Sequence, residues 1–263
     1  MDSIITRLDL TGWAVLALCA MLVGISKTGM PGFGIIFVPL MAMILPARQS
    51  TGVLLGMLIL GDIFAASYYH RAALWGHILK LIPAALVGIL AGYMVMEKIS
   101  DSALKRVIAI IVLSMLGLNA LRGNKNEEMH IHLQFLFAIV MGFLAGFTTM
   151  MANAAGPVMI VYLLAMRLPK IEFVGTTAWF FFIINWLKVP FSVKLGLITF
   201  DSVKANLFML PFIILGSVLG IGSLKKMPQK FFEIAMQLLT AIAAINLLIP
   251  KNLWLRLINA MTN

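Results

Sequence analysis

The chain has 263 residues, of which 62% are hydrophobic and 11% are charged, and its formal net charge is +10. Soluble domains carry about 25% charged residues, so this composition excludes a soluble globular protein and predicts a polytopic membrane protein. The excess of Lys and Arg is typical of residues that gather at membrane interfaces. The sequence has no extended basic patch of the kind that binds nucleic acid, so we predict no nucleic-acid partner.

Eight apolar runs follow one another along the chain. Most have the roughly 20 residues that a spanning helix needs. They are residues 12–45, 52–69, 77–96, 103–121, 133–166, 171–190, 203–222 and 230–249. We therefore predict an all-α fold with about eight membrane segments and the lipid bilayer as its surroundings.

The first and fifth runs are too long for one ordinary crossing. Each has about 34 residues, which would extend about 50 Å as continuous helix against a hydrocarbon core of about 30 Å. Each also contains a stretch rich in Gly and small residues with one Pro, at 24–34 and at 145–157. Because Gly and Pro are costly inside a helix, we expect both stretches to interrupt it. A broken crossing and a re-entrant hairpin both fit, and the length favours the hairpin.

Gly, Pro and polar residues recur at nearly constant spacing in two halves of the chain, which indicates an internal duplication. The matching pairs include Gly24 and Gly146, Pro46 and Pro169, Gly52 and Gly175, Asp62 and Asn185, and Pro83 and Pro211. We divide the chain into a first repeat at 1–121, a polar linker at 122–132 and a second repeat at 133–263. Such repeats are typical of secondary transporters, whose site lies between the repeats. The loop charges favour neither orientation, and we expect an inverted pair.

The two interrupted stretches supply most of the candidate substrate-binding residues. Pro31 and Pro157 suit the first position of a helix, so each is expected to begin a half-helix whose free N–H groups and dipole favour an anion. A kink that only lets helices pack closely is the alternative interpretation. From these stretches the predicted site takes Ser26, Lys27, Thr28, Gly29, Pro31, Gly32, Thr148, Thr149, Asn153 and Gly156.

Charged residues inside apolar runs are the second group of candidates, because a charge there costs roughly 2.5–3.5 kcal/mol on insertion scales. Lys27 is either a positive charge for an anionic substrate or a structural partner of Asp62. Asp62 is either a proton-coupling carboxylate or the counter-ion of a lysine. Asn185 and Lys188 share one helix face, and we assign both to substrate binding. Lys188 is also close enough to the end of its run to snorkel to the interface.

Replacing Lys27 with Ala is expected to abolish anion transport while the protein still inserts into the membrane. The physical reason is the loss of the positive charge that would hold the anion. Uptake by reconstituted protein measures this, and flux at the wild-type level would remove Lys27 from the site.

Other chemistries have little support in the sequence. A single cysteine, Cys19, excludes an internal disulfide and a cysteine metal cage. No phosphate loop, zinc-protease motif or nucleophile–His–acid set is present. We predict no enzymatic activity, no cofactor and no metal site. Tyr68 and Tyr69 are expected to be interface anchors.

Several segments resemble the TauE/SafE family of sulfite-exporter-like permeases. They include G-I-S-K-T-G-M-P-G-F-G at 24–34, G-D-I-F-A-A-S-Y-Y-H-R at 61–71, A-N-A-A-G-P-V-M at 152–159 and N-W-L-K-V-P-F at 185–191. Many family members have consecutive glycines in the first break. This chain has Ser-Lys-Thr at 26–28 there, so it resembles a lysine-bearing branch of the family.

The resemblance implies a permease of the bacterial inner membrane that moves sulfite or a related sulfur-containing anion, such as thiosulfate, sulfoacetate or another organosulfonate. Alternating access, with or without proton coupling, is the expected mechanism. An anion channel and a carrier of a metal cation or a neutral compound stay open as alternatives.

Overall fold

The computed structural model describes residues 8–31, 37, 40–41, 44–95 and 131–248. Every regular element that it names in this part of the chain is a helix, so the predicted all-α fold is confirmed. The helices are α2 (Leu10–Thr28), α4 (Ala47–Tyr68), α5 (Trp75–Val95), α7 (Ile131–Ala152), α8 (Gly156–Ala165), α9 (Lys170–Lys194), α10 (Phe200–Lys226) and α11 (Gln229–Leu248). The predicted segment at 103–121, most of the linker and Gly32 lie outside the described residues.

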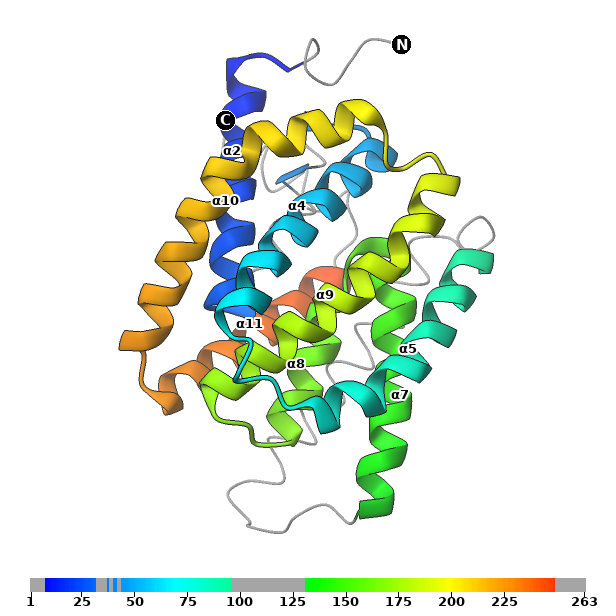
Figure 1. Ribbon diagram of the computed structural model, residues 1–263, viewed down its shortest axis with the longest axis vertical. Coiled ribbons are helices and arrows are strands. Elements are labelled where there is room, and N and C mark those ends of the chain that lie inside the picture. Colours follow the sequence, from blue (N-terminus) through cyan, green and yellow to red (C-terminus); the bar gives the residue numbers. More distant parts are fainter. Residues whose placement is uncertain (1–7, 32–36, 38–39, 42–43, 96–130, 249–263) are drawn as a thin grey trace.

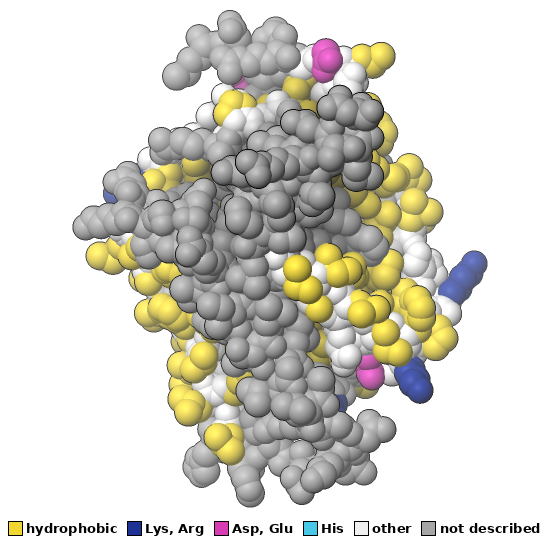
Figure 2. All heavy atoms as spheres, turned by 180° about the vertical axis from the view of Figure 1, so that it is seen from behind, with side chains coloured by type: hydrophobic (Ala, Val, Ile, Leu, Met, Phe, Trp, Pro, Cys, Tyr) yellow, Lys and Arg dark blue, Asp and Glu magenta, His cyan; other side chains and the backbone are white. Residues whose placement is uncertain are grey.

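Six of these helices are long and apolar enough to cross a membrane, namely α2, α4, α5, α7, α9 and α10. The predicted segment at 230–249 corresponds to α11, which is not among the six. Large hydrophobic side chains remain exposed along α7 and α10, including Phe135 and Phe212. Figure 2 shows hydrophobic side chains over most of the described surface on both flanks. This surface suits lipid, and the chain is a multi-pass membrane protein.

Helices α4 and α9 begin in the same way. Each follows a proline with almost the same backbone, Pro46 at φ −56°, ψ 147° and Pro169 at φ −54°, ψ 146°. Proline lacks an N–H group, and it pushes the residue before it out of the helical region, so it separates a helix from the chain that precedes it. The two prolines are one of the pairs on which the predicted duplication rests.

The helices continue further into the Gly-rich stretches than the sequence analysis predicts. Helix α2 runs through residues 24–28 and ends at Thr28, with Gly29 as its C-cap. Helix α7 likewise includes residues 145–152. The expectation that both stretches interrupt the helix over their whole length is therefore wrong. The second break is short, from residue 153 to residue 155, and both stretches follow long helices, α2 of 19 residues and α7 of 22 residues.

Close packing of backbones explains why glycines stay helical here. A Cβ atom added to Gly24 on α2 would lie 2.3 Å from the carbonyl oxygen of Ile213 on α10. A Cβ atom added to Gly146 on α7 would lie 1.9 Å from the carbonyl oxygen of Ala85 on α5. Helices in membranes associate through such small-residue contacts, and the contact offsets the low helix propensity of glycine.

Helix α8 returns after the second break. It begins at Gly156, has Pro157 in its first turn and extends for only 10 residues. It packs against α7. The prediction that Pro157 begins a short helix is confirmed, and 133–166 is a long helix followed by a short returning one. For the first break, residues 32–36 lie outside the described part of the chain.

The helices of the two predicted repeats interlock. Helix α2 packs along α10, α7 packs along α5, and α4 packs against α9. In Figure 1, α2 and α4 run downwards from their first residues, whereas α7 and α9 run upwards. Each long first helix therefore lies against a helix from the other half of the sequence, and α4 and α9 face each other between these pairs.

Replacing Gly146 with Ala is expected to destabilise the protein by about 1–3 kcal/mol, because the new methyl group would collide with the α5 backbone. The thermal unfolding temperature in detergent measures the effect. Gly222→Ala is the matched control, since a Cβ atom at Gly222 on α10 meets nothing within 4 Å. An unchanged unfolding temperature for Gly146→Ala would contradict the close contact between α5 and α7.

Candidate functional site

A buried ion pair joins α2 to α4. The Lys27 Nζ atom lies 2.7 Å from Asp62 Oδ1, and the Asp62 side chain is fully buried. Asn185 on α9 donates a hydrogen bond from Nδ2 to the other carboxylate oxygen of Asp62 at 2.6 Å. The Lys27 ammonium also lies 4.4 Å from the ring centre of Phe181, within the range of a cation–π contact. Three helices thus meet at one carboxylate.

The positions of Asp62 and Asn185 follow from the helices that carry them. These two residues are equivalent in the predicted duplication, and the structure places them in direct contact where α4 packs against α9. The Oδ1 atom of Asn185 is buried and has no hydrogen-bond partner among the described residues. A buried acceptor without a partner is unusual. Asn185 Oδ1 can therefore accept one further hydrogen bond at the centre of the cluster.

Lys188 lies in a cage of neutral oxygen atoms. Its Nζ atom donates to the Thr149 carbonyl oxygen at 3.1 Å, to the Thr149 hydroxyl at 3.0 Å and to Asn153 Oδ1 at 2.6 Å. The residue is only 2% exposed. Lys188 therefore does not snorkel to the interface, which its place in the apolar run also allowed. Helix α9 continues to Lys194, so Lys188 is almost two turns from the end of the helix. Its amine faces Thr149 on α7.

Asn153 holds the second break in its bent shape. Its φ angle is 53°, in the left-handed region, where asparagine is better tolerated than most residues. Its side chain accepts from Lys188 and donates from Nδ2 to the Thr51 carbonyl oxygen on α4 at 3.4 Å. One residue of the break therefore contacts both α9 and α4.

The two clusters together contain two lysines and one carboxylate. Asn185 and Lys188 lie one turn apart on α9, so the Asp62 cluster and the Lys188 cage are neighbours on the same helix. At ordinary charges, Lys27 and Lys188 contribute +2 and Asp62 contributes −1, which gives +1. Buried charges are normally paired, so this arrangement suits an additional anion.

Three of the predicted neutral donors are occupied by backbone carbonyl groups. The Ser26 hydroxyl donates to the Pro31 carbonyl oxygen at 3.4 Å, and the Thr148 hydroxyl donates to Ala145 at 3.3 Å. The Thr28 hydroxyl lies 2.9 Å from the Gly24 carbonyl oxygen and 2.8 Å from that of Ser217, and shares its single proton between them. In this conformation these hydroxyls stabilise helix ends and helix packing instead of pointing at the Lys188 cage.

The two breaks approach each other. A Cβ atom on Gly156 would lie 3.8 Å from the Pro31 carbonyl oxygen, which is ordinary van der Waals contact. Gly29 packs tightly on α10, where a Cβ atom would lie 2.5 Å from the Gly220 carbonyl oxygen. No side chain caps the N-terminus of helix α8.

Two aromatic residues near the clusters were not expected as site residues. Phe181 covers the Lys27 ammonium. Tyr69, expected to be an interface anchor, is only 4% exposed and donates from its hydroxyl to the Thr28 carbonyl oxygen at 2.7 Å. Only Phe181 had a usable signal in the sequence, since it lies one helical turn from Asn185.

Metal chemistry has no support among the described side chains, where no group of three or more His, Cys, Asp or Glu residues could hold a metal ion. The arrangement instead consists of two lysines, one carboxylate, two amides and a threonine hydroxyl. Side chains of these kinds bind charged groups through hydrogen bonds and ion pairs.

Comparison with known families identifies the chain. The family model described as "Sulfite exporter TauE/SafE" matches residues 16–247. Comparisons with curated proteins and with solved structures gave no match. The matched residues include both clusters and all six of the long apolar helices in large part. The chain belongs to the sulfite exporter TauE/SafE family and is a membrane transport protein.

Proposed function

We propose that this protein is a permease of the bacterial inner membrane that moves sulfite or a related small sulfur-containing anion, such as an organosulfonate, by alternating access. The anion would bind between the Asp62 cluster and the Lys188 cage. Lys188, Thr149 and Asn153 would hold it from one side, with Lys27 and Asn185 on the other.

The observation that carries this proposal is the amine of Lys188. It is almost fully buried, and the hydrogen-bond partners that the structure gives it are neutral oxygens. A buried ammonium without a carboxylate in contact is costly. A small oxyanion would neutralise it, and sulfite or a sulfonate offers three oxygen atoms to the donors around it.

The arrangement of the helices supports alternating access. Equivalent helices of the predicted repeats run in opposite directions (Figure 1), and residues from both repeats meet at Asp62 and Asn185. In transporters with inverted repeats, rocking of one half against the other opens a central site to each side in turn. We place the substrate at this central contact for that reason.

Proton coupling would act through the ion pair. Protonation of Asp62 removes its attraction for Lys27, which frees the ammonium to interact with the substrate anion. Deprotonation re-forms the pair at 2.7 Å and releases the anion. One proton would then travel with one substrate anion in the same direction.

The test is uptake of radiolabelled sulfite into proteoliposomes, with and without a pH gradient, in competition with thiosulfate, sulfoacetate and simple carboxylates. We expect saturable uptake that sulfur-containing anions inhibit best and that a pH gradient stimulates. Flux that does not saturate and shows no counterflow would indicate a channel. Uptake no greater than in empty liposomes would remove sulfite as the substrate.

A further inference from the structure

A pocket lies outside the buried clusters, at the ends of three helices. Its volume is about 360 Å³, and it is lined by Tyr68, Tyr69, Arg71, Ala72, Ile171 and Lys225. The lining comes from the end of α4 and the loop after it, the start of α9 and the end of α10.

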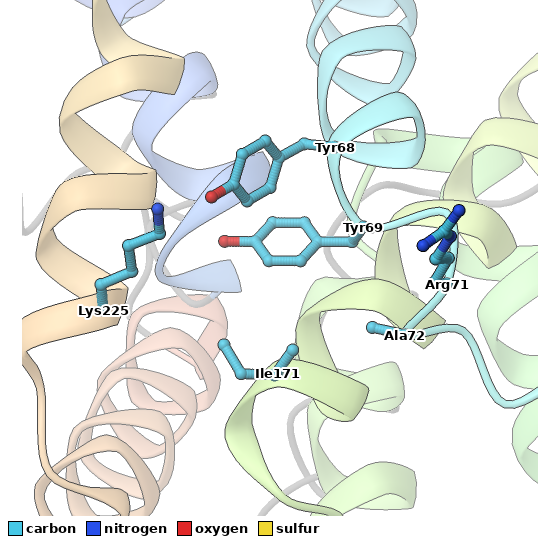
Figure 3. A pocket seen from close by; sticks show the side chains of 6 residues that line it. All are labelled: Tyr68, Tyr69, Arg71, Ala72, Ile171 and Lys225. Carbon is cyan, nitrogen blue, oxygen red and sulfur yellow. The ribbon is translucent and has the colours of Figure 1, made fainter.

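The lining is positively charged and carries a hydroxyl donor. Arg71 and Lys225 are exposed cations, and neither forms an ion pair with a carboxylate among the described residues. The Lys225 Nζ atom lies 5.5 Å from the centre of the Tyr68 ring. In Figure 3 the hydroxyl groups of Tyr68 and Tyr69 point toward the side on which Lys225 lies. No carboxylate lines the pocket.

Tyr69 lines the pocket and also contacts the end of α2. This side chain is only 4% exposed and forms part of the pocket wall. Its hydroxyl donates to the carbonyl oxygen of Thr28, the residue next to Lys27 at the end of α2. Burial raises the pKa of the Tyr69 hydroxyl, and Tyr68 adds to this shift, so Tyr69 stays protonated and keeps its contact with α2.

We propose that this pocket is an outer binding site for a small oxyanion, beside Tyr69, whose hydroxyl contacts the residue next to Lys27. The proposal rests on the proposed function, because it takes the same class of ligand. Arg71 and Lys225 would attract and hold the anion, and Tyr68 would donate a hydrogen bond to it. Cations around a concave surface raise the local concentration of an anionic ligand.

The test compares sulfite uptake by Arg71→Gln, Lys225→Gln and the double variant in proteoliposomes of phosphatidylcholine. We expect KM to rise about threefold in each single variant and about tenfold in the double variant, with an unchanged maximal rate. The difference should shrink at high salt, which screens exposed charges. Lys226→Gln is the control, since it removes a neighbouring exposed charge that does not line the pocket.

Lipid provides the second arm, because the phosphate of an anionic headgroup has the same chemistry as a free oxyanion. Adding phosphatidylglycerol should raise the KM of the wild-type protein by a larger factor than that of the double variant, because the repulsion of sulfite by the anionic surface affects both and competition at the pocket affects only the wild type. An unchanged KM for the double variant in phosphatidylcholine would overturn the outer site, even if wild-type transport is normal.

Direct binding separates this proposal from the transport function. Equilibrium dialysis of radiolabelled sulfite against the purified protein should show one component of binding that Lys188→Met retains and that Arg71→Gln/Lys225→Gln loses. This result would support the outer site even for a protein that transports another anion. Binding that survives in the double variant and disappears in Lys188→Met would overturn it.

Discussion

Replacing Lys188 with Met is expected to lower the initial rate of sulfite uptake by about 10- to 100-fold. Hydrogen bonds to a charged group contribute about 1.5–3 kcal/mol, which corresponds to this range of rates if they hold the anion during transport. Methionine fills a similar volume without the charge. The measurement is uptake into proteoliposomes that contain equal amounts of reconstituted protein.

Lys194→Gln is the matched control for this experiment. Lys194 lies on the same helix and is exposed, so the loss of its charge should leave uptake within about twofold of wild type. Thermal unfolding of both variants in detergent shows whether the fold is retained. If Lys188→Met folds normally and still transports at the wild-type rate, the substrate does not depend on the caged amine, and the proposed position of the anion is wrong.

Lys27→Met is expected to destabilise the protein by about 3–5 kcal/mol, because it leaves the fully buried carboxylate of Asp62 without its counter-ion. Asp62→Asn should likewise destabilise it by leaving a buried ammonium. The double variant Lys27→Met/Asp62→Asn should recover most of the loss, since neither charge remains. Unfolding temperatures of the four proteins in detergent measure the coupling, and purely additive effects would contradict the ion pair.

Uptake by the same double variant decides between the two interpretations of Lys27. If the pair is only structural, the double variant folds and transports sulfite. If Lys27 holds the substrate and Asp62 couples it to protons, the double variant folds and does not transport. In that case Asp62→Asn alone should also lose the stimulation of uptake by a pH gradient. Normal stimulation of uptake in that variant would refute the proton-coupling role of Asp62.

The sequence alone determined the class of the protein and much of its helical framework. Composition was sufficient to predict a membrane protein, because hydrocarbon tolerates few charges. The apolar runs predicted the long helices that the structure describes, and Pro157 marked the start of α8 because proline fits a first helical turn. The charged candidates Lys27, Asp62 and Lys188 were visible as rare ions inside apolar segments.

The tertiary structure decided how those residues are paired. Gly24 stays helical because its missing side chain lets the backbone of α10 approach. That helix is distant in the sequence, since the nearby contact between Thr28 and Ser217 joins residues that are 189 positions apart. The same holds for Lys188, whose cage comes from α7 and the break after it. Helix propensity and hydropathy are local properties, whereas an ion pair or an amine cage forms only when distant helices pack together. The placement of two lysines beside one buried carboxylate is a property of that packing.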